Sequence, residues 1–102
     1  MTYQLDLDED QISQLAGILN RLKTERSQAA VDWERSIADI AAAMDTDNFD
    51  SNAVEEALKI RVDSAKRMRN EVLEALKKTH QMLNAQQRST LAYLLRSGQL
   101  SI

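Results

Sequence analysis

The chain has 102 residues, of which 28% are charged, and its formal net charge at pH 7 is −3. It contains no cysteine, which excludes disulfides, thiolate metal sites and a cysteine nucleophile. The absence of proline, the presence of only two glycines and the abundance of strong helix formers predict an all-α protein, and the length favours a single domain over residues 1–102.

The distribution of charge and hydropathy limits the partners that we expect. Residues 1–50 contain 11 acids and 4 bases, and residues 51–102 contain 5 acids and 9 bases, so the halves carry −7 and +4. Opposite charges favour packing of the halves, and an acidic total argues against nucleic acid as a partner. No window is apolar enough for membrane insertion and no export signal follows Met1, so the sequence as written predicts a cytoplasmic protein. We expect a periplasmic location if an export signal has been removed.

The first predicted helix begins at a capping box. Asp8 can accept from the backbone N–H of Gln11, and the Gln11 side chain can reach back to the N–H of Asp8, while Leu7 precedes the cap. Apolar residues then recur at steps of mostly three and four as far as Met44, which predicts a helix of about 36 residues. The apolar stripe comprises Ile12, Leu15, Leu19, Leu22, Ala29, Trp33, Ile37, Ile40 and Met44.

A polar segment, residues 45–51, predicts the bend between two antiparallel helices. Its acids imitate a calcium-binding loop, but Phe49 stands where an oxygen ligand is required and Asp50 stands where glycine is required. We therefore interpret the segment as a cluster of candidate helix caps, Asp50, Ser51 or Asn52, in which Asn52 and Glu55 have the spacing of a capping box.

The second and third predicted helices follow this bend. A stripe of Val54, Leu58, Val62, Ala65, Met68, Val72, Ala75, Leu76 and Met82 predicts a helix of roughly 30 residues. On this helix Asp63 is placed to pair with Arg67. Asn84 and Gln87 then repeat the capping box and begin a short helix that ends near Gly98.

The lengths of the two long helices, about 54 Å and about 46 Å, bring both capping boxes to the same end of the hairpin. We therefore interpret Leu7, Gln11, Leu83 and Gln87 as architectural residues. The same register places Trp33 opposite residues 62–65, where we expect it to act as a packing anchor.

Two such boxes, a long helix with a central tryptophan, a short acidic bend and a second long helix resemble the Spy/CpxP family and its LTXXQ motif. Leu83, Gln87 and Arg88 match the second Leu-Thr-x-x-Gln-Arg box of that family, with Asn84 in the place of threonine as an equivalent cap. Asp8 takes that place in the first box. The resemblance covers nearly all of residues 5–97.

This resemblance implies a Spy-like fold, in which a long antiparallel helical hairpin and a short C-terminal helix dimerise into a curved cradle. It also implies an ATP-independent chaperone or stress-response regulator that holds unfolded or regulatory protein segments. The apolar width of the helices and their adaptable methionines favour the same function. The client-binding or dimer surface is expected to include Trp33, Ile37, Met44, Ile60, Met68 and Met82.

Two alternative functions stay open. The family includes metal-responsive proteins of the CnrX and ZraP types, which are linked to metal resistance. The single histidine, His80, would then need Glu71, Glu74 or Met82 as further ligands across a dimer interface. The leading hypothesis assigns neither a metal nor a cofactor. The second alternative is a dedicated cytosolic adaptor. No catalytic motif is present, so we do not expect an enzyme.

Overall fold

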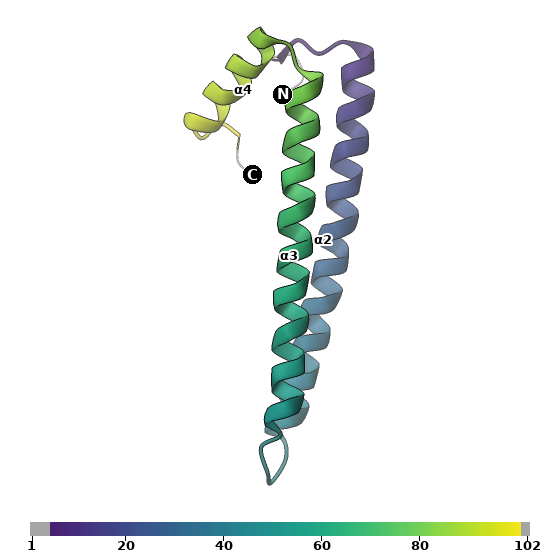
Figure 1. The fold of residues 1–102 in the computed structure, drawn as a ribbon, viewed down its shortest axis with the longest axis vertical. Coiled ribbons are helices and arrows are strands. Elements are labelled where there is room, and N and C mark those ends of the chain that lie inside the picture. Colours follow the sequence, from purple (N-terminus) through teal and green to yellow (C-terminus); the bar gives the residue numbers. More distant parts are fainter. Residues whose placement is uncertain (1–4, 101–102) are drawn as a thin grey trace. The chain divides into compact units, whose positions relative to one another are not determined.

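The computed structural model describes residues 5–100, which form α-helices and no strand (Figure 1). Helix α2 spans Glu9–Met44, α3 spans Ser51–Met82 and α4 spans Ala85–Arg96. The prediction of an all-α fold is confirmed, and the 36 residues of α2 and 32 residues of α3 agree with the predicted lengths. Within the described part of the chain, no helix has the length and hydropathy needed to cross a membrane.

The chain divides into two compact units, to which both long helices contribute. Unit 1 consists of Met1–Asn20 and Glu74–Ile102, and unit 2 consists of Arg21–Leu73. Unit 1 therefore holds the beginning of α2, the end of α3 and all of α4, whereas unit 2 holds the remainder of α2 and α3 and the bend that joins them.

Leucine side chains form the core of unit 1. Leu5, Leu83 and Leu94 are only 5%, 2% and 3% exposed, and Leu7 is half-buried. Full burial of a leucine stabilises a fold by about 1.5–3 kcal/mol. The leucine that precedes the second capping box is therefore one of the most buried residues in the unit.

Helix α4 ends as the sequence predicts. Ser97 is the C-cap, and Gly98 follows with a φ of 79°, a left-handed conformation that favours glycine. The N–H of Gly98 donates to the carbonyl of Leu95 at 3.3 Å, and the N–H of Leu100 donates to that of Leu94 at 3.2 Å. These bonds satisfy two carbonyls of the last helical turn.

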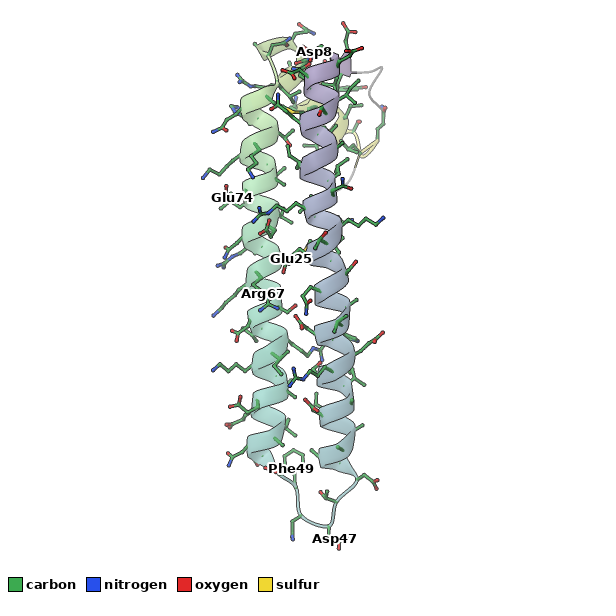
Figure 2. All side chains as sticks on the ribbon, turned by 90° about the vertical axis from the view of Figure 1, so that its right-hand side faces the viewer. Asp8, Glu25, Asp47, Phe49, Arg67 and Glu74 are labelled. Carbon is green, nitrogen blue, oxygen red and sulfur yellow. The ribbon has the colours of Figure 1, made fainter. Side chains whose placement is uncertain are left out.

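In unit 2, a bend of six residues joins the two antiparallel segments, and Figure 2 shows Asp47 and Phe49 within it. The carboxylate of Asp50 accepts from the backbone N–H of Ala53 at 3.1 Å, so Asp50 caps α3. The expected box between Asn52 and Glu55 is wrong, because α3 already begins at Ser51 and Asn52 therefore lies inside its first turn.

Small side chains line the contact between the two helices of unit 2. Ser36, Ala43, Ala57 and Ser64 are 0%, 6%, 1% and 6% exposed. Short side chains let two backbones approach closely, and the buried hydroxyl of Ser36 donates to the carbonyl of Trp33 at 2.8 Å. Among residues 5–100, no buried side-chain nitrogen or oxygen lacks a hydrogen-bond partner, so the buried hydroxyls of this seam are satisfied.

Only part of the apolar stripe that the sequence predicted as the seam is exposed beside it, since other members such as Leu22, Ile40 and Met68 are half-buried. Trp33 is 53% exposed, so the prediction that it anchors the packing is wrong. Ile37 and Met44 on α2 are also exposed, at 46% and 67%. At about 100° per residue, the stripe of small side chains and the stripe of large ones are neighbours on each helix. Short side chains allow the two backbones to approach closely, which favours the stripe of small side chains at the seam.

Candidate functional site

The two capping boxes form as the sequence predicts, both in unit 1. At the start of α2, the N–H of Gln11 donates to Asp8 Oδ1 at 2.8 Å, and the N–H of Asp8 donates to Gln11 Oε1 at 3.1 Å. Figure 2 labels Asp8 at this helix start. At the start of α4, Asn84 and Gln87 exchange the same two bonds at 2.9 Å each. Each box satisfies backbone donors that a helix start leaves unpaired.

The two glutamines of the boxes also bind each other. Gln11 Nε2 donates to Gln87 Oε1 at 2.8 Å, and Gln87 Nε2 donates to Gln11 Oε1 at 3.0 Å. Their second N–H groups donate to backbone carbonyls, from Gln11 to Met82 at 2.7 Å and from Gln87 to Asp6 at 3.1 Å. Both carbonyls belong to the residue that lies two positions before the cap of the opposite box.

This symmetric exchange uses the full hydrogen-bonding capacity of both amides. Each oxygen accepts two bonds and each nitrogen donates two, and Gln87 is only 6% exposed. The paired boxes therefore lock the start of α2 to the junction of α3 and α4. Arg88, the next residue of the motif, donates from Nε to the carbonyl of His80 at 2.9 Å and ties α4 to the last turn of α3.

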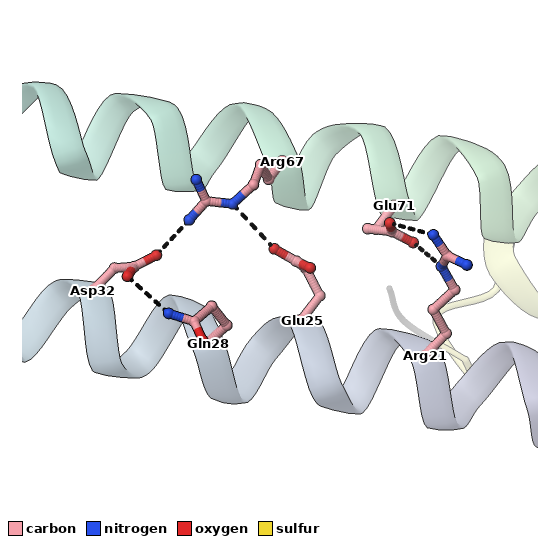
Figure 3. A network of polar contacts seen from close by, with 6 residues as sticks. All are labelled: Arg21, Glu25, Gln28, Asp32, Arg67 and Glu71. Atoms are coloured by element: carbon pink, nitrogen blue, oxygen red, sulfur yellow. Dashed lines mark hydrogen bonds and ion pairs between the residues drawn. The ribbon is translucent and has the colours of Figure 1, made fainter.

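One flank of unit 2 is held by ion pairs between α2 and α3 (Figure 3). Arg67 on α3 lies between two carboxylates of α2, with Nη2 2.5 Å from Asp32 Oδ2 and Nε 3.5 Å from Glu25 Oε1. Gln28 donates to the other oxygen of Asp32 at 3.0 Å. The expected pairing of Arg67 with Asp63 along α3 is not the bond that forms, since Arg67 reaches across to α2 instead.

A second pair continues this ion-pair flank. Arg21 holds Glu71 through two bonds, from Nε at 2.7 Å and from Nη2 at 3.1 Å. Glu25 and Gln28 belong to segment 23–28 of α2, which contains no apolar residue, so polar contacts replace apolar packing there. Because the arginines are 50–66% exposed, each pair contributes on the order of 1 kcal/mol or less.

The opposite flank of unit 2 is apolar and exposed. We call it the apolar flank and define it by five side chains that are 46–67% exposed, namely Trp33, Ile37, Met44, Leu58 and Val62. The three residues of α2 lie within about 40° of one another around the helix, because their spacings are four and seven. Large exposed apolar patches often mark sites of interaction with other molecules.

A hollow opens in the apolar flank at Trp33. The guanidinium of Arg61 lies over the Trp33 ring, 3.4 Å from its centroid, a cation–π contact. The hollow has a volume of about 370 Å³ and is lined by Ala29, Trp33, Arg61, Ser64, Ala65 and Met68. Its lining includes small residues because the side chains along the seam are short. The predicted position of Trp33 opposite residues 62–65 is thus confirmed.

The structure gathers only some of the residues predicted for a binding surface. Trp33, Ile37 and Met44 belong to the apolar flank, and Met68 lines the hollow. Ile60 is half-buried on the side of α3 that faces the ion-pair flank, and Met82 belongs to unit 1. Sequence reasoning missed Arg61, although its position one residue before the segment predicted to face Trp33 was a usable signal.

The acids predicted for a metal site have other partners. Glu71 binds Arg21, and Glu74 lies 3.4 Å from Lys77, while the His80 side chain is exposed. Among residues 5–100, no three side chains of His, Asp or Glu lie close enough together to hold a metal ion.

Comparisons of this chain with protein-family models, with curated proteins and with solved structures found no match.

Proposed function

We propose that this chain is a non-enzymatic protein-binding module of the Spy/CpxP type, which holds segments of other polypeptides without ATP. The observation that supports this function best is the apolar flank, on which five large side chains are about half exposed. The paired capping boxes supply the second support, because they form the architectural motif on which the family resemblance rests.

The exposed area sets the strength of binding that we expect. Burying the remaining half of each of the five side chains contributes about 1 kcal/mol, or about 5 kcal/mol in total. The entropy lost on association opposes much of this gain. The flank should therefore hold clients weakly and reversibly, which suits a chaperone that must release them.

The proposal includes self-association. In a Spy-like dimer, two copies form a cradle and part of the exposed apolar surface lies between them. Light scattering measures this directly, since a dimer doubles the mass of 11.6 kDa.

Suppression of client aggregation tests the proposed function. A chemically denatured client is diluted into buffer with stoichiometric protein and no ATP, and turbidity is followed. Val62→Asp on the apolar flank should weaken suppression severalfold. Val31→Asp is the matched control, because Val31 is also exposed, at 57% against 53%, but lies on another face of α2. Equal suppression by both variants, or no suppression by the unmodified chain, would contradict the proposal.

A further inference from the structure

The arginines of unit 2 differ in how their charges are compensated. On the ion-pair flank, Arg21 and Arg67 are bound to carboxylates. Arg61 on the apolar flank is stacked on Trp33, and no carboxylate among residues 5–100 lies within ion-pair distance of it. The helical neighbours of Arg61 at three and four residues are all uncharged, namely Ala57, Leu58, Ser64 and Ala65. Its charge is therefore available to a partner.

Two further cations lie on the same flank. Arg26 precedes Trp33 by seven residues and Arg69 follows Val62 by seven, so each lies on nearly the same helical face as that neighbour. The ion pair between Arg21 and Glu71 sets the register, in which Arg26 lies opposite residue 66, so Arg69 lies three residues, about 4.5 Å along the helix axis, from the level of Arg26.

Neither of these two cations is neutralised within the described part of the chain. Residues three and four positions away from Arg26 and Arg69 include no acid, and neither side chain forms an ion pair with residues 5–100. Two like charges on one flank repel each other, and an anion bound near both would relieve this repulsion.

The apolar flank thus changes along its length from apolar side chains near the bend to cations at its other end. Beginning at the bend, it presents Met44, then Ile37 with Leu58, then the hollow at Trp33, and finally the pair of Arg26 and Arg69. The hollow and the arginine pair are separated by about 10 Å along α2, the length of about three residues of extended chain or seven residues of helix.

We infer that the apolar flank binds an acidic amphipathic polypeptide segment in one orientation. An apolar side chain of the segment enters the hollow beside Trp33, and carboxylates that follow it bind Arg61 and the arginine pair. This inference rests on the proposed function and names the chemistry of its partner. Carboxylates are suited to guanidinium groups because two parallel N–H···O bonds can form.

Fluorescence anisotropy of labelled peptides tests the inference on the full chain. One peptide carries leucines and a phenylalanine in its first half and glutamates in its second half, and the other has glutamines in place of the glutamates. At low salt the glutamate peptide should bind about fivefold or more tightly, the factor that corresponds to about 1 kcal/mol. Added salt should reduce this preference.

Variants of single arginines assign the preference to the site. Arg61→Gln should remove most of the preference for glutamate and leave binding of the glutamine peptide within about twofold. Arg35→Gln is the matched control, since Arg35 is an exposed arginine of α2 away from the apolar flank, and this variant should keep the preference. Circular dichroism confirms that each variant is folded.

The outcomes separate this inference from the proposed function. Suppressed client aggregation together with equal binding of both peptides overturns the inference and leaves the proposed function standing. Loss of self-association in Arg61→Gln, without any peptide binding, overturns the inference by identifying a second copy as the occupant. A glutamate preference that Arg61→Gln removes supports the inference, even if aggregation suppression fails and the chaperone proposal falls.

Discussion

Replacement of Gln87 by alanine should destabilise unit 1 strongly, because this one side chain takes part in four hydrogen bonds. Its amide oxygen accepts from the N–H of Asn84 and from Gln11, and its nitrogen donates to Gln11 and to the carbonyl of Asp6. Gln87→Ala removes all four bonds at a position that is 6% exposed.

The magnitude follows from the number of bonds. A hydrogen bond contributes about 1 kcal/mol net, and water can rehydrate the exposed backbone of Asn84, so Gln87→Ala should lower the free energy of unfolding by about 3 kcal/mol. For a chain of this size, the melting temperature should fall by about 10–20 °C. Gln86→Ala, an exposed neighbour in the same helical turn, is the control and should change stability by less than about 0.5 kcal/mol.

A double-mutant cycle with Gln11→Ala isolates the bond pair between the glutamines. Each single variant loses both amide–amide bonds, so the double variant should be about 2 kcal/mol more stable than the sum of the single losses predicts. Urea unfolding followed by circular dichroism measures all four proteins. A coupling free energy near zero would refute the reasoning, because it would mean that the two amides do not bind each other in solution.

Gln87→Glu adds a pH dependence. A carboxylate at this position cannot donate to Asp6 or Gln11, and its burial against a carbonyl favours the neutral form, so the pKa of this new side chain should be raised above that of the unfolded chain. A raised folded-state pKa makes the variant relatively most stable at low pH, and this stability is lost as the pH rises through the folded pKa. The destabilisation relative to the unmodified chain should therefore be smaller at acid pH than at neutral pH.

Three other substitutions have defined outcomes in urea unfolding. Arg67→Ala leaves its two carboxylate partners on α2 unpaired and should cost about 1 kcal/mol, less at high salt; no salt dependence would contradict the ion pairs. Asp50→Ala should lower the free energy of unfolding by about 1 kcal/mol through loss of the cap of α3, whereas Asn52→Ala should have little effect. A larger loss in Asn52→Ala than in Asp50→Ala would identify Asn52 as the cap instead. Gly98→Ala should cost about 1 kcal/mol because of its φ of 79°, although space for a Cβ atom is open; an unchanged stability would argue against that conformation.

The local features of this protein could be predicted from its residues alone. Asp8, Asn84 and Gly98 stand at helix ends where the structure has them, because capping depends on groups three or four residues apart. The lengths of the helices also followed from the spacing of three and four residues between apolar positions. The equal level of the two capping boxes followed from those lengths, and the bond between Gln11 and Gln87 confirms it.

Which faces of the helices meet could not be predicted and became evident only in the folded chain. On α2, small residues such as Ser36 and large ones such as Trp33 form neighbouring stripes with the same period, so periodicity cannot distinguish the seam from the exposed flank. Close packing of the two helices buried small residues such as Ser36 and left large ones such as Trp33 and Ile37 about half exposed. The same choice stacked Arg61 on Trp33 and turned Arg67 toward α2, because side chains distant in sequence meet only after the helices have packed.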